Sequence, residues 1–219
     1  MNTQNSQELP PEAHSLCKEN WQNVIERVHQ ACDQAGRDPI SVRVIGVTKY
    51  VDMARTKALY DAGCRDLGES RPQALWEKAA AYGAGDRTVQ WHLIGHLQRN
   101  KVVKTISYNP VVHTIDSVKL AEAISRAAVD SSFVCEGLIE VNLSEDVGRG
   151  GLLPDSLLDK AAQILELPGV CIRGLMGMAS HPEARRNPRQ EFAHLRELRD
   201  TVNERFPDAG GLPELSMGM

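Results

Sequence analysis

Short runs of β-branched and aliphatic residues alternate with helix-like stretches along almost the whole chain. Seven runs have the length and composition of buried strands, at 42–48, 65–69, 89–94, 111–115, 134–141, 170–178 and 213–217. The stretches before, between and after them predict helices at 14–35, 53–62, 71–82, 97–105, 117–129, 154–166 and 188–206. This alternation indicates an α/β domain in which helices connect parallel strands.

Two architectures fit such an alternation: an open doubly wound sheet and a closed (β/α)8 barrel of the TIM type. No G-x-G-x-x-G turn follows the first strand, and the repeat is even with no break in composition, which favours the barrel. The chain stops at Met219, after the seventh strand, so strand 8 and the final helix are missing from the pattern. Either the barrel closes unusually, or it borrows an element, or the domain is truncated at its C-terminus; we expect the last.

The organisation of the chain is that of a single domain. Residues 1–13 are polar and include the pair Pro10-Pro11, which predicts a disordered leader ahead of one barrel domain at 14–219. A chain of 219 residues with 42% hydrophobic content can bury one sizeable core. Asn187 and Pro188 mark the start of the last helix as its N-cap and first helical residue.

Charge and cysteine usage exclude several function classes. The net charge of −4 predicts no general affinity for nucleic acid or acidic membranes. The sequence has no apolar run of 18 residues of the kind that predicts a membrane span. The five cysteines are scattered and form no C-x-x-C pair, which is typical of a reduced, cytoplasmic protein.

Lys49 stands where the first strand, "VRVIGVTKYVD", should end. Ligands bind at the carboxyl ends of strands in both architectures, and a partly desolvated lysine there could act as a nucleophile that forms a Schiff base. A lysine that extends into solvent or pairs with Glu69 is the alternative, and position alone favours it. The other strand ends place Glu69-Ser70, Gly95-His96, Asp116, Asn142, Ser180 and Gly218 beside it.

Three further features are ambiguous from local pattern alone. His92 and His96 are four residues apart, but Gly95 at the strand end keeps them off a shared helical face, so we expect no metal and a His92 satisfied inside the barrel. The loop "SEDVGRGGL" at 144–152, with Arg149, could cradle a phosphate or be a plain turn. Ser216 and Gly218 in the terminal "SMGM" give a weaker phosphate signal.

Several short sequence blocks are together more specific than any local pattern. They are "VIGVTKY", "DLGES", "WHLIGHLQRNK", "HTIDS", "EVNLSEDVGRGGL", "RGLMGM" and "LSMGM". In this order they resemble the pyridoxal phosphate homeostasis protein family, relatives of the alanine racemase N-terminal barrel. The resemblance runs from about residue 15 to the last residue. It implies a TIM barrel that binds pyridoxal 5′-phosphate (PLP) as a Schiff base on Lys49.

The resemblance also assigns roles to other residues. Ser216 and Gly218 match the phosphate cup, while Val47, His92 and Met176 match contacts around the cofactor. Ser70 and Arg149 are departures, since the family often has asparagine and lysine there. The final arginine and glycine of the family's phosphate clamp lie on strand 8, beyond these residues.

The implied function is PLP homeostasis: a monomeric carrier or buffer that supplies PLP, including to apo PLP enzymes, and balances amino and keto acids without established turnover. A PLP-dependent racemase or decarboxylase of the same barrel type is the alternative. Such enzymes need a second domain, for which this chain has no residues left. A third possibility is a barrel that binds a phosphorylated metabolite without PLP.

Overall fold

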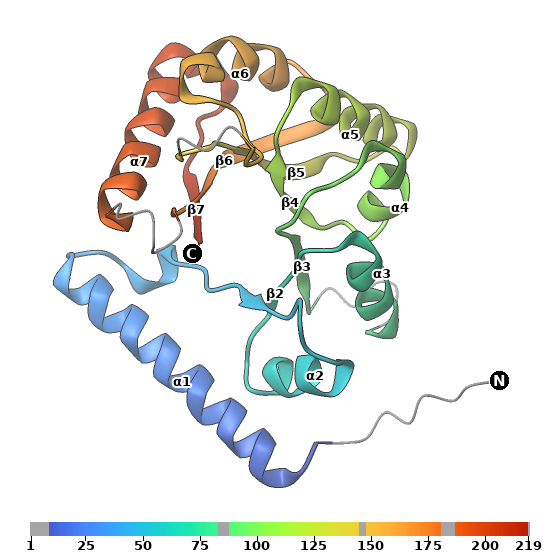
Figure 1. Ribbon diagram of the computed structural model, residues 1–219, viewed down its shortest axis with the longest axis vertical. Coiled ribbons are helices and arrows are strands. Elements are labelled where there is room, and N and C mark those ends of the chain that lie inside the picture. The colour runs from blue at the N-terminus through green and yellow to red at the C-terminus, as the bar shows by residue number, and fades with distance from the viewer. Residues whose placement is uncertain (1–8, 83–87, 145–147, 181–186, 219) are drawn as a thin grey trace.

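The computed structural model describes residues 9–82, 88–144, 148–180 and 187–218. Figure 1 shows a curved sheet with helices around its outer side. The seven strands are all parallel and follow chain order across the sheet. They are β1 (Gly46–Val47), β2 (Asp66–Glu69), β3 (Gln90–Leu93), β4 (Val111–Ile115), β5 (Cys135–Glu140), β6 (Val170–Met178) and β7 (Glu214–Gly218).

Seven α-helices precede, connect and flank these strands in the described part of the chain. They are α1 (Pro11–Gln34), α2 (Met53–Asp61), α3 (Pro72–Ala81), α4 (Val102–Ile106), α5 (Val118–Asp130), α6 (Leu157–Leu165) and α7 (Pro188–Arg205). Short 3-10 turns lie at η1 (Pro39–Ser41), η2 (Arg99–Lys101), η3 (Pro154–Ser156) and η5 (Pro207–Ala209). The order of the elements confirms the predicted β/α alternation. Asn187 is the N-cap of α7 as predicted, because its side-chain oxygen accepts from the Arg189 amide.

Four elements start more than one residue away from the prediction or start in a different conformation. The strand predicted at 42–48 shortens to two residues, because Gly46 pairs with Leu67 near the start of β2 and most of the residues before it have no neighbouring strand. The predicted helix at 97–105 is a 3-10 turn followed by the short α4, and the helix at 154–166 also starts as a 3-10 turn. α1 begins at Pro11, so residues 11–13 of the predicted leader are helical. Residues 1–8 lie outside the described residues.

The sheet has two chemically different faces. Its outer face packs on the helices through buried aliphatic side chains, among them Leu67, Leu93, Val112, Ile139 and Leu175. The concave face holds a smaller apolar cluster of Val111, Leu138 and Met176 beside polar side chains. The sheet curves far enough for β4 and β7 to touch across this concave side, where the Nδ1 atom of His113 lies 2.8 Å from the Ser216 hydroxyl. The arrangement is a partial (β/α) barrel.

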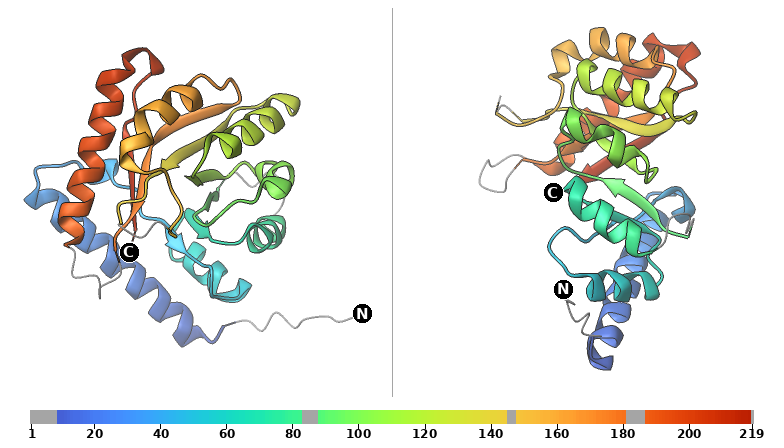
Figure 2. Two further views of the ribbon diagram at one scale, coloured as in Figure 1. Left: turned by 45° about the horizontal axis from the view of Figure 1, so that its top comes forward. Right: turned by 90° about the vertical axis from the view of Figure 1, so that its right-hand side faces the viewer.

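The barrel is open between its first and last strands. β1 and β7 are each paired on one side only within the described residues. α1 lies beside α2 and buries only Cys32 of its described residues, and Figures 1 and 2 show it away from α5 and α6. An eighth strand beyond Met219 stays a prediction. Within the described ranges, no helix is both long and apolar enough to cross a membrane.

Candidate functional site

Lys49 lies two residues after the end of β1, in a tight turn whose Val51 amide donates to the Thr48 carbonyl at 3.1 Å. Asp52 then caps α2 by accepting from the Arg55 amide. The Lys49 side chain is exposed, with its ammonium 5.1 Å from the centre of the Tyr50 ring. The expectation of a partly desolvated lysine is therefore wrong for this structure, because an edge strand and an open barrel leave the amine in contact with water.

A buried polar clamp fixes the backbone on both sides of Lys49. The Lys78 ammonium, from α3, donates to the carbonyls of Thr48 and Val51 at 2.7 and 2.9 Å. It also pairs with Oε1 of Glu69 at 2.5 Å, and the Thr48 hydroxyl donates to the same oxygen at 2.6 Å. Glu69 therefore pairs with Lys78, and the sequence alternative that paired it with Lys49 is wrong. The Lys49 turn is held in place while its amine is left available.

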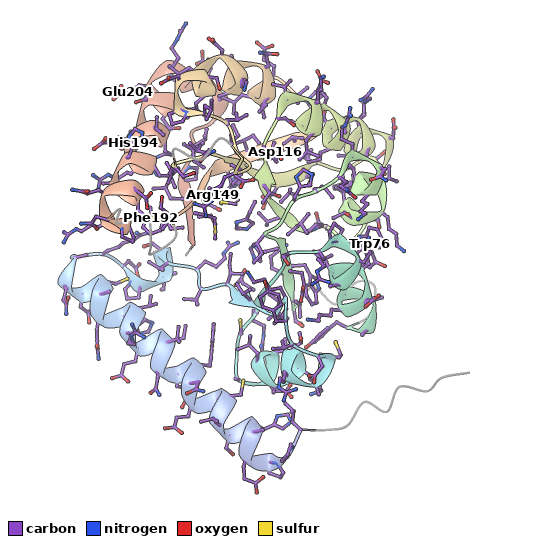
Figure 3. All side chains as sticks on the ribbon, viewed as in Figure 1. Trp76, Asp116, Arg149, Phe192, His194 and Glu204 are labelled. Atoms are coloured by element: carbon purple, nitrogen blue, oxygen red, sulfur yellow. The ribbon has the colours of Figure 1, made fainter. Side chains whose placement is uncertain are left out.

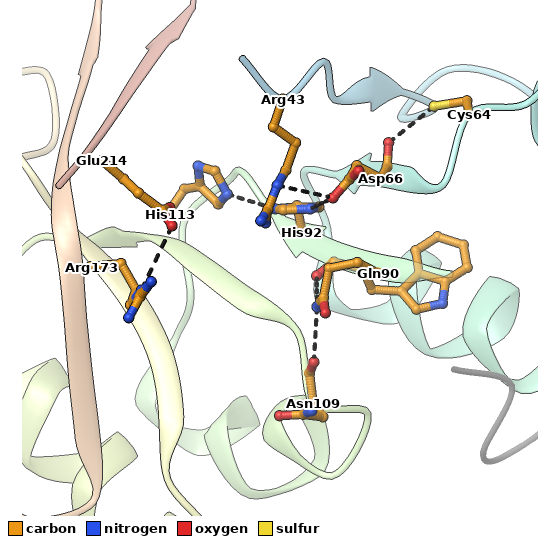
Figure 4. Close-up of polar contacts among 10 residues, drawn as sticks. Arg43, Cys64, Asp66, Gln90, His92, Asn109, His113, Arg173 and Glu214 are labelled. Atoms are coloured by element: carbon orange, nitrogen blue, oxygen red, sulfur yellow. Dashed lines mark hydrogen bonds and ion pairs between the residues drawn. The ribbon is translucent and has the colours of Figure 1, made fainter. Parts of the chain in front are cut away.

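A chain of hydrogen bonds crosses the concave side of the sheet (Figure 4). Oδ1 of Asp66 lies 2.9 Å from Nε2 of His92, and Nδ1 of His92 lies 2.8 Å from Nε2 of His113. The chain ends at the His113 contact with the Ser216 hydroxyl, and Arg43 approaches Asp66 at 3.6 Å. We call Asp66, His92, His113 and Ser216 the barrel relay. Burial, with the nearby His92 and Arg43 charges adding to it, lowers the pKa of His113 to about 3, so this imidazole is neutral near pH 7.

The other residues expected on the concave side are placed unevenly. Met176 is buried in the small apolar cluster, as an inward position on β6 requires. Val47 is 51% exposed because β1 is an edge strand. Gly218 ends β7, where an added Cβ would come within 2.9 Å of the Met178 sulfur. His92 is satisfied inside the barrel as predicted, with both ring nitrogens engaged, whereas His96 contacts Asp116 at 3.2 Å.

Ser70 and Arg149 lie at the carboxyl ends of β2 and β5. Ser70 is partly exposed, and its carbonyl lies so close to Gly95 that a Cβ there would come within 2.1 Å of it. Arg149 donates to the Ala179 carbonyl at 3.4 Å and lines a cavity of about 140 Å³ with Glu140. Figure 3 shows Arg149 and Asp116 on the inner side of the helices. Residues 145–147 of the predicted phosphate loop, and Met219 of "SMGM", lie outside the described residues.

The carboxylate of Glu140 adds negative charge next to Arg149. Burial raises the pKa of Glu140, and the nearby Asp116 carboxylate raises it further, while His96 and Arg149 act in the opposite direction. The rim between β4 and β5 is therefore a mixed-charge region. It does not present the purely cationic surface that a simple anion loop would have.

Three contributors to the site were missed by sequence reasoning. Lys78 sits on a helix and Asp66 at the start of a strand, so neither lies at a strand's carboxyl end. His113 lies in the "HTIDS" block, at an inward position of β4. A polar residue at an inward position of an otherwise apolar strand, two residues after the inward Val111, is the signal that marks His113.

Comparison with known proteins shows to which family the chain is related. The family model for the alanine racemase N-terminal domain matches residues 19–214. A pyridoxal phosphate homeostasis protein from Aquifex aeolicus is 35% identical over 201 residues, which cover 92% of this chain and 86% of that protein. The chain belongs to the pyridoxal phosphate homeostasis protein family.

Two solved structures show how far the family's fold extends over this chain. A protein of unknown function from Bifidobacterium adolescentis has a TM-score of 0.83 at 28% identity and covers 97% of both chains. PipY of Synechococcus elongatus, solved with PLP bound, has a TM-score of 0.69 at 26% identity, covering 87% of this chain and 97% of its own. The fold of these two structures thus extends over 87% to 97% of this chain.

The residues present fit PLP by their chemistry. Lys49 offers an exposed primary amine of the kind that reacts with an aldehyde. For a phosphate, Ser216 offers a hydroxyl, Gly218 offers a backbone position without a side chain, and Arg149 offers a cation. None of the eight residues expected around the cofactor, the two departures Ser70 and Arg149 included, carries a negative charge. The donor set is suited to an anionic aldehyde.

Proposed function

We propose that this protein binds PLP on Lys49 and serves intracellular PLP homeostasis as a carrier or buffer. The observation that carries the proposal is the exposed Lys49 amine at the end of β1, in a turn whose flanking carbonyls are fixed by Lys78. A fixed turn holds the amine at one place, and exposure leaves it free to react. The names of the relatives and the PLP bound to PipY support the same ligand.

The chain's own residues divide the work of holding the ligand. PLP supplies an aldehyde that reacts reversibly with a lysine amine, which makes binding strong and still reversible. Ser216, Gly218 and Arg149 would hold the phosphate, and Met176, Val47 and His92 would border the ring. Ser70 replaces the family's frequent asparagine with a shorter hydroxyl, which offers one hydrogen-bonding group in place of two.

The proposal includes a cytoplasmic monomer that delivers PLP to apo enzymes. The scattered cysteines support a reducing compartment, and burial raises the pKa of three of them, Cys17, Cys64 and Cys135. A catalytic racemase would need an acid or base on the far side of the cofactor. Tyr60 and Tyr82 contact each other edge to face by α2 and α3, outside the concave face, and so do not supply one.

Absorbance and trapping test the binding step. Wild-type protein incubated with PLP should shift the PLP absorbance band, and borohydride should fix a label that peptide mass maps to Lys49. Lys49→Ala should abolish both, whereas Lys57→Ala is the matched control, since Lys57 is an exposed lysine on α2 paired with Asp61. An unlabelled Lys49 in the wild type would sink the proposal and favour a phosphorylated metabolite.

Solvent exchange separates the carrier from the racemase. The PLP-loaded protein is incubated in deuterated water with D- and L-alanine, and deuterium at Cα is followed by mass spectrometry. A carrier should give no sustained exchange. Repeated turnover, abolished by Lys49→Ala and kept by Lys57→Ala, would favour the racemase.

A further inference from the structure

The number of protons that the barrel relay carries depends on what Ser216 binds. His92 and His113 are 1% and 3% exposed, so water does not satisfy their ring nitrogens and each nitrogen must find its partner within the relay. The Asp66 carboxylate is held by Arg43 and can only accept hydrogen bonds while it is ionised. That end of the relay therefore fixes the direction of every bond that follows.

With both imidazoles neutral, the relay has one direction. The Nε2 proton of His92 is donated to Asp66, which leaves Nδ1 of His92 as an acceptor for the Nε2 proton of His113. Nδ1 of His113 is then an acceptor too, so the Ser216 hydroxyl must donate inward to it. In this state Ser216 offers a ligand only lone pairs, which suits a donor and opposes a phosphate.

A phosphate that accepts the Ser216 hydroxyl proton requires the opposite direction. His113 must then donate from Nδ1 to the Ser216 oxygen, and its Nε2 must accept from Nδ1 of His92. Since Nε2 of His92 still donates to Asp66, His92 carries protons on both nitrogens. This state holds one proton more than the first, on His92 next to the Asp66 carboxylate, while His113 stays neutral in both.

We propose that the barrel relay couples phosphate binding at Ser216 to the uptake of one proton by His92, with His113 as the positioning residue that transmits it. The inference rests on the proposed function, because the phosphate is that of PLP. The proton uptake adds positive charge on the concave side of the sheet when the anion arrives.

The groups around the relay favour His92 over His113 as the site of the charge. The Asp66 carboxylate on β2 contacts His92 directly, and Arg43, which precedes β1, approaches the same carboxylate oxygen. The Cys64 thiol donates to the backbone carbonyl of Asp66. The charges that act on His113 are those of His92 and Arg43, and both oppose a proton on it, while Arg173 on β6 pairs with Glu214 on β7 at 3.6 Å (Figure 4). The low pKa of His113 agrees with an imidazole that relays a proton position without taking the charge.

Imidazole nitrogen NMR reads the relay directly. In PLP-free ¹⁵N-histidine protein near pH 7.5, His92 and His113 should both show the Nε2-protonated neutral pattern. PLP should convert His92 to the doubly protonated pattern and His113 to the Nδ1-protonated tautomer. Single His92→Gln and His113→Gln variants assign the signals.

Proton uptake gives a second, independent measurement. Calorimetry in two buffers of different ionisation enthalpy should show about one more proton taken up per PLP by the wild type than by Ser216→Ala. Both proteins share the protonation changes of Lys49 and PLP, so their difference isolates the relay. The same proton makes PLP binding weaker as the pH rises. For each pH unit, the Kd of the wild type should therefore increase by a factor up to about ten times larger than the Kd of Ser216→Ala does.

The possible outcomes separate the two proposals. Lys49 labelling together with the two imidazole changes supports both. Lys49 labelling with unchanged imidazoles and equal proton uptake overturns the relay and leaves PLP binding intact. The absence of both labelling and imidazole change overturns both.

Discussion

Replacing Lys78 with methionine removes the ammonium that joins three acceptors around the Lys49 turn and keeps most of the side chain's volume. The Glu69 carboxylate would then be left at 1% exposure with only the Thr48 hydroxyl, since its Oε2 has no hydrogen-bond partner among the described residues. Removing one partner of a buried ion pair costs about 3–5 kcal/mol, because the remaining charge stays desolvated. Of the two carbonyls that lose the ammonium, that of Val51 lies at the exposed end, where water replaces the donor at lower cost, whereas that of Thr48 is partly buried and adds to the loss.

Urea unfolding followed by circular dichroism measures this cost. Lys78→Met should lower the free energy of unfolding by about 3–5 kcal/mol, and Lys57→Met, which breaks the exposed pair with Asp61, by at most about 1 kcal/mol. Adding Glu69→Gln to Lys78→Met should recover part of the loss, because the buried charge is removed. A Lys78→Met protein no less stable than Lys57→Met, or a double variant less stable than the single, would refute the argument.

Two further predictions concern the strand ends and the relay. The pKa of His113 is about 3 in the folded protein and 6.5 for the free side chain, so the unfolded chain binds this proton more readily. His113 therefore costs no stability above about pH 6.5. As the pH falls from there toward 3, it lowers the stability of the fold progressively. Lowering the pH from 7.5 to 5 should remove about 2 kcal/mol through this group, and urea midpoints of His113→Leu should lack that share of the pH dependence. Gly95→Ala should cost about 1–3 kcal/mol or more in urea unfolding, because its Cβ would lie 2.1 Å from the Ser70 carbonyl oxygen. Gly150→Ala meets only Glu140, at 3.6 Å, and should change stability little. Equal losses for the two glycine variants, or an unchanged pH slope in His113→Leu, would contradict these accounts.

Much of the fold could be predicted because its signals are local. Each strand and helix carries its own periodicity, and the Asn187 cap and Pro188 mark the start of α7 within two residues. The failures occurred where a neighbour decides the structure. The run at 42–48 has strand composition, yet only Gly46 and Val47 form a strand, because β2 offers no pairing partner earlier. α4 is short although its sequence continues a helical pattern, and its first turn tightens to 3-10 geometry.

The amino-acid order alone determined the β/α repeat, the place of Lys49 at the end of the first strand and the blocks that resemble the family, since these depend on residues close together in the chain. Only the tertiary structure decided which side chains meet. Lys78 reaches Thr48 from 30 residues away, and Ser216 reaches His113 from 103 residues away. Such contacts depend on the curvature of the sheet, which brings inward side chains of non-neighbouring strands together and which no local pattern records.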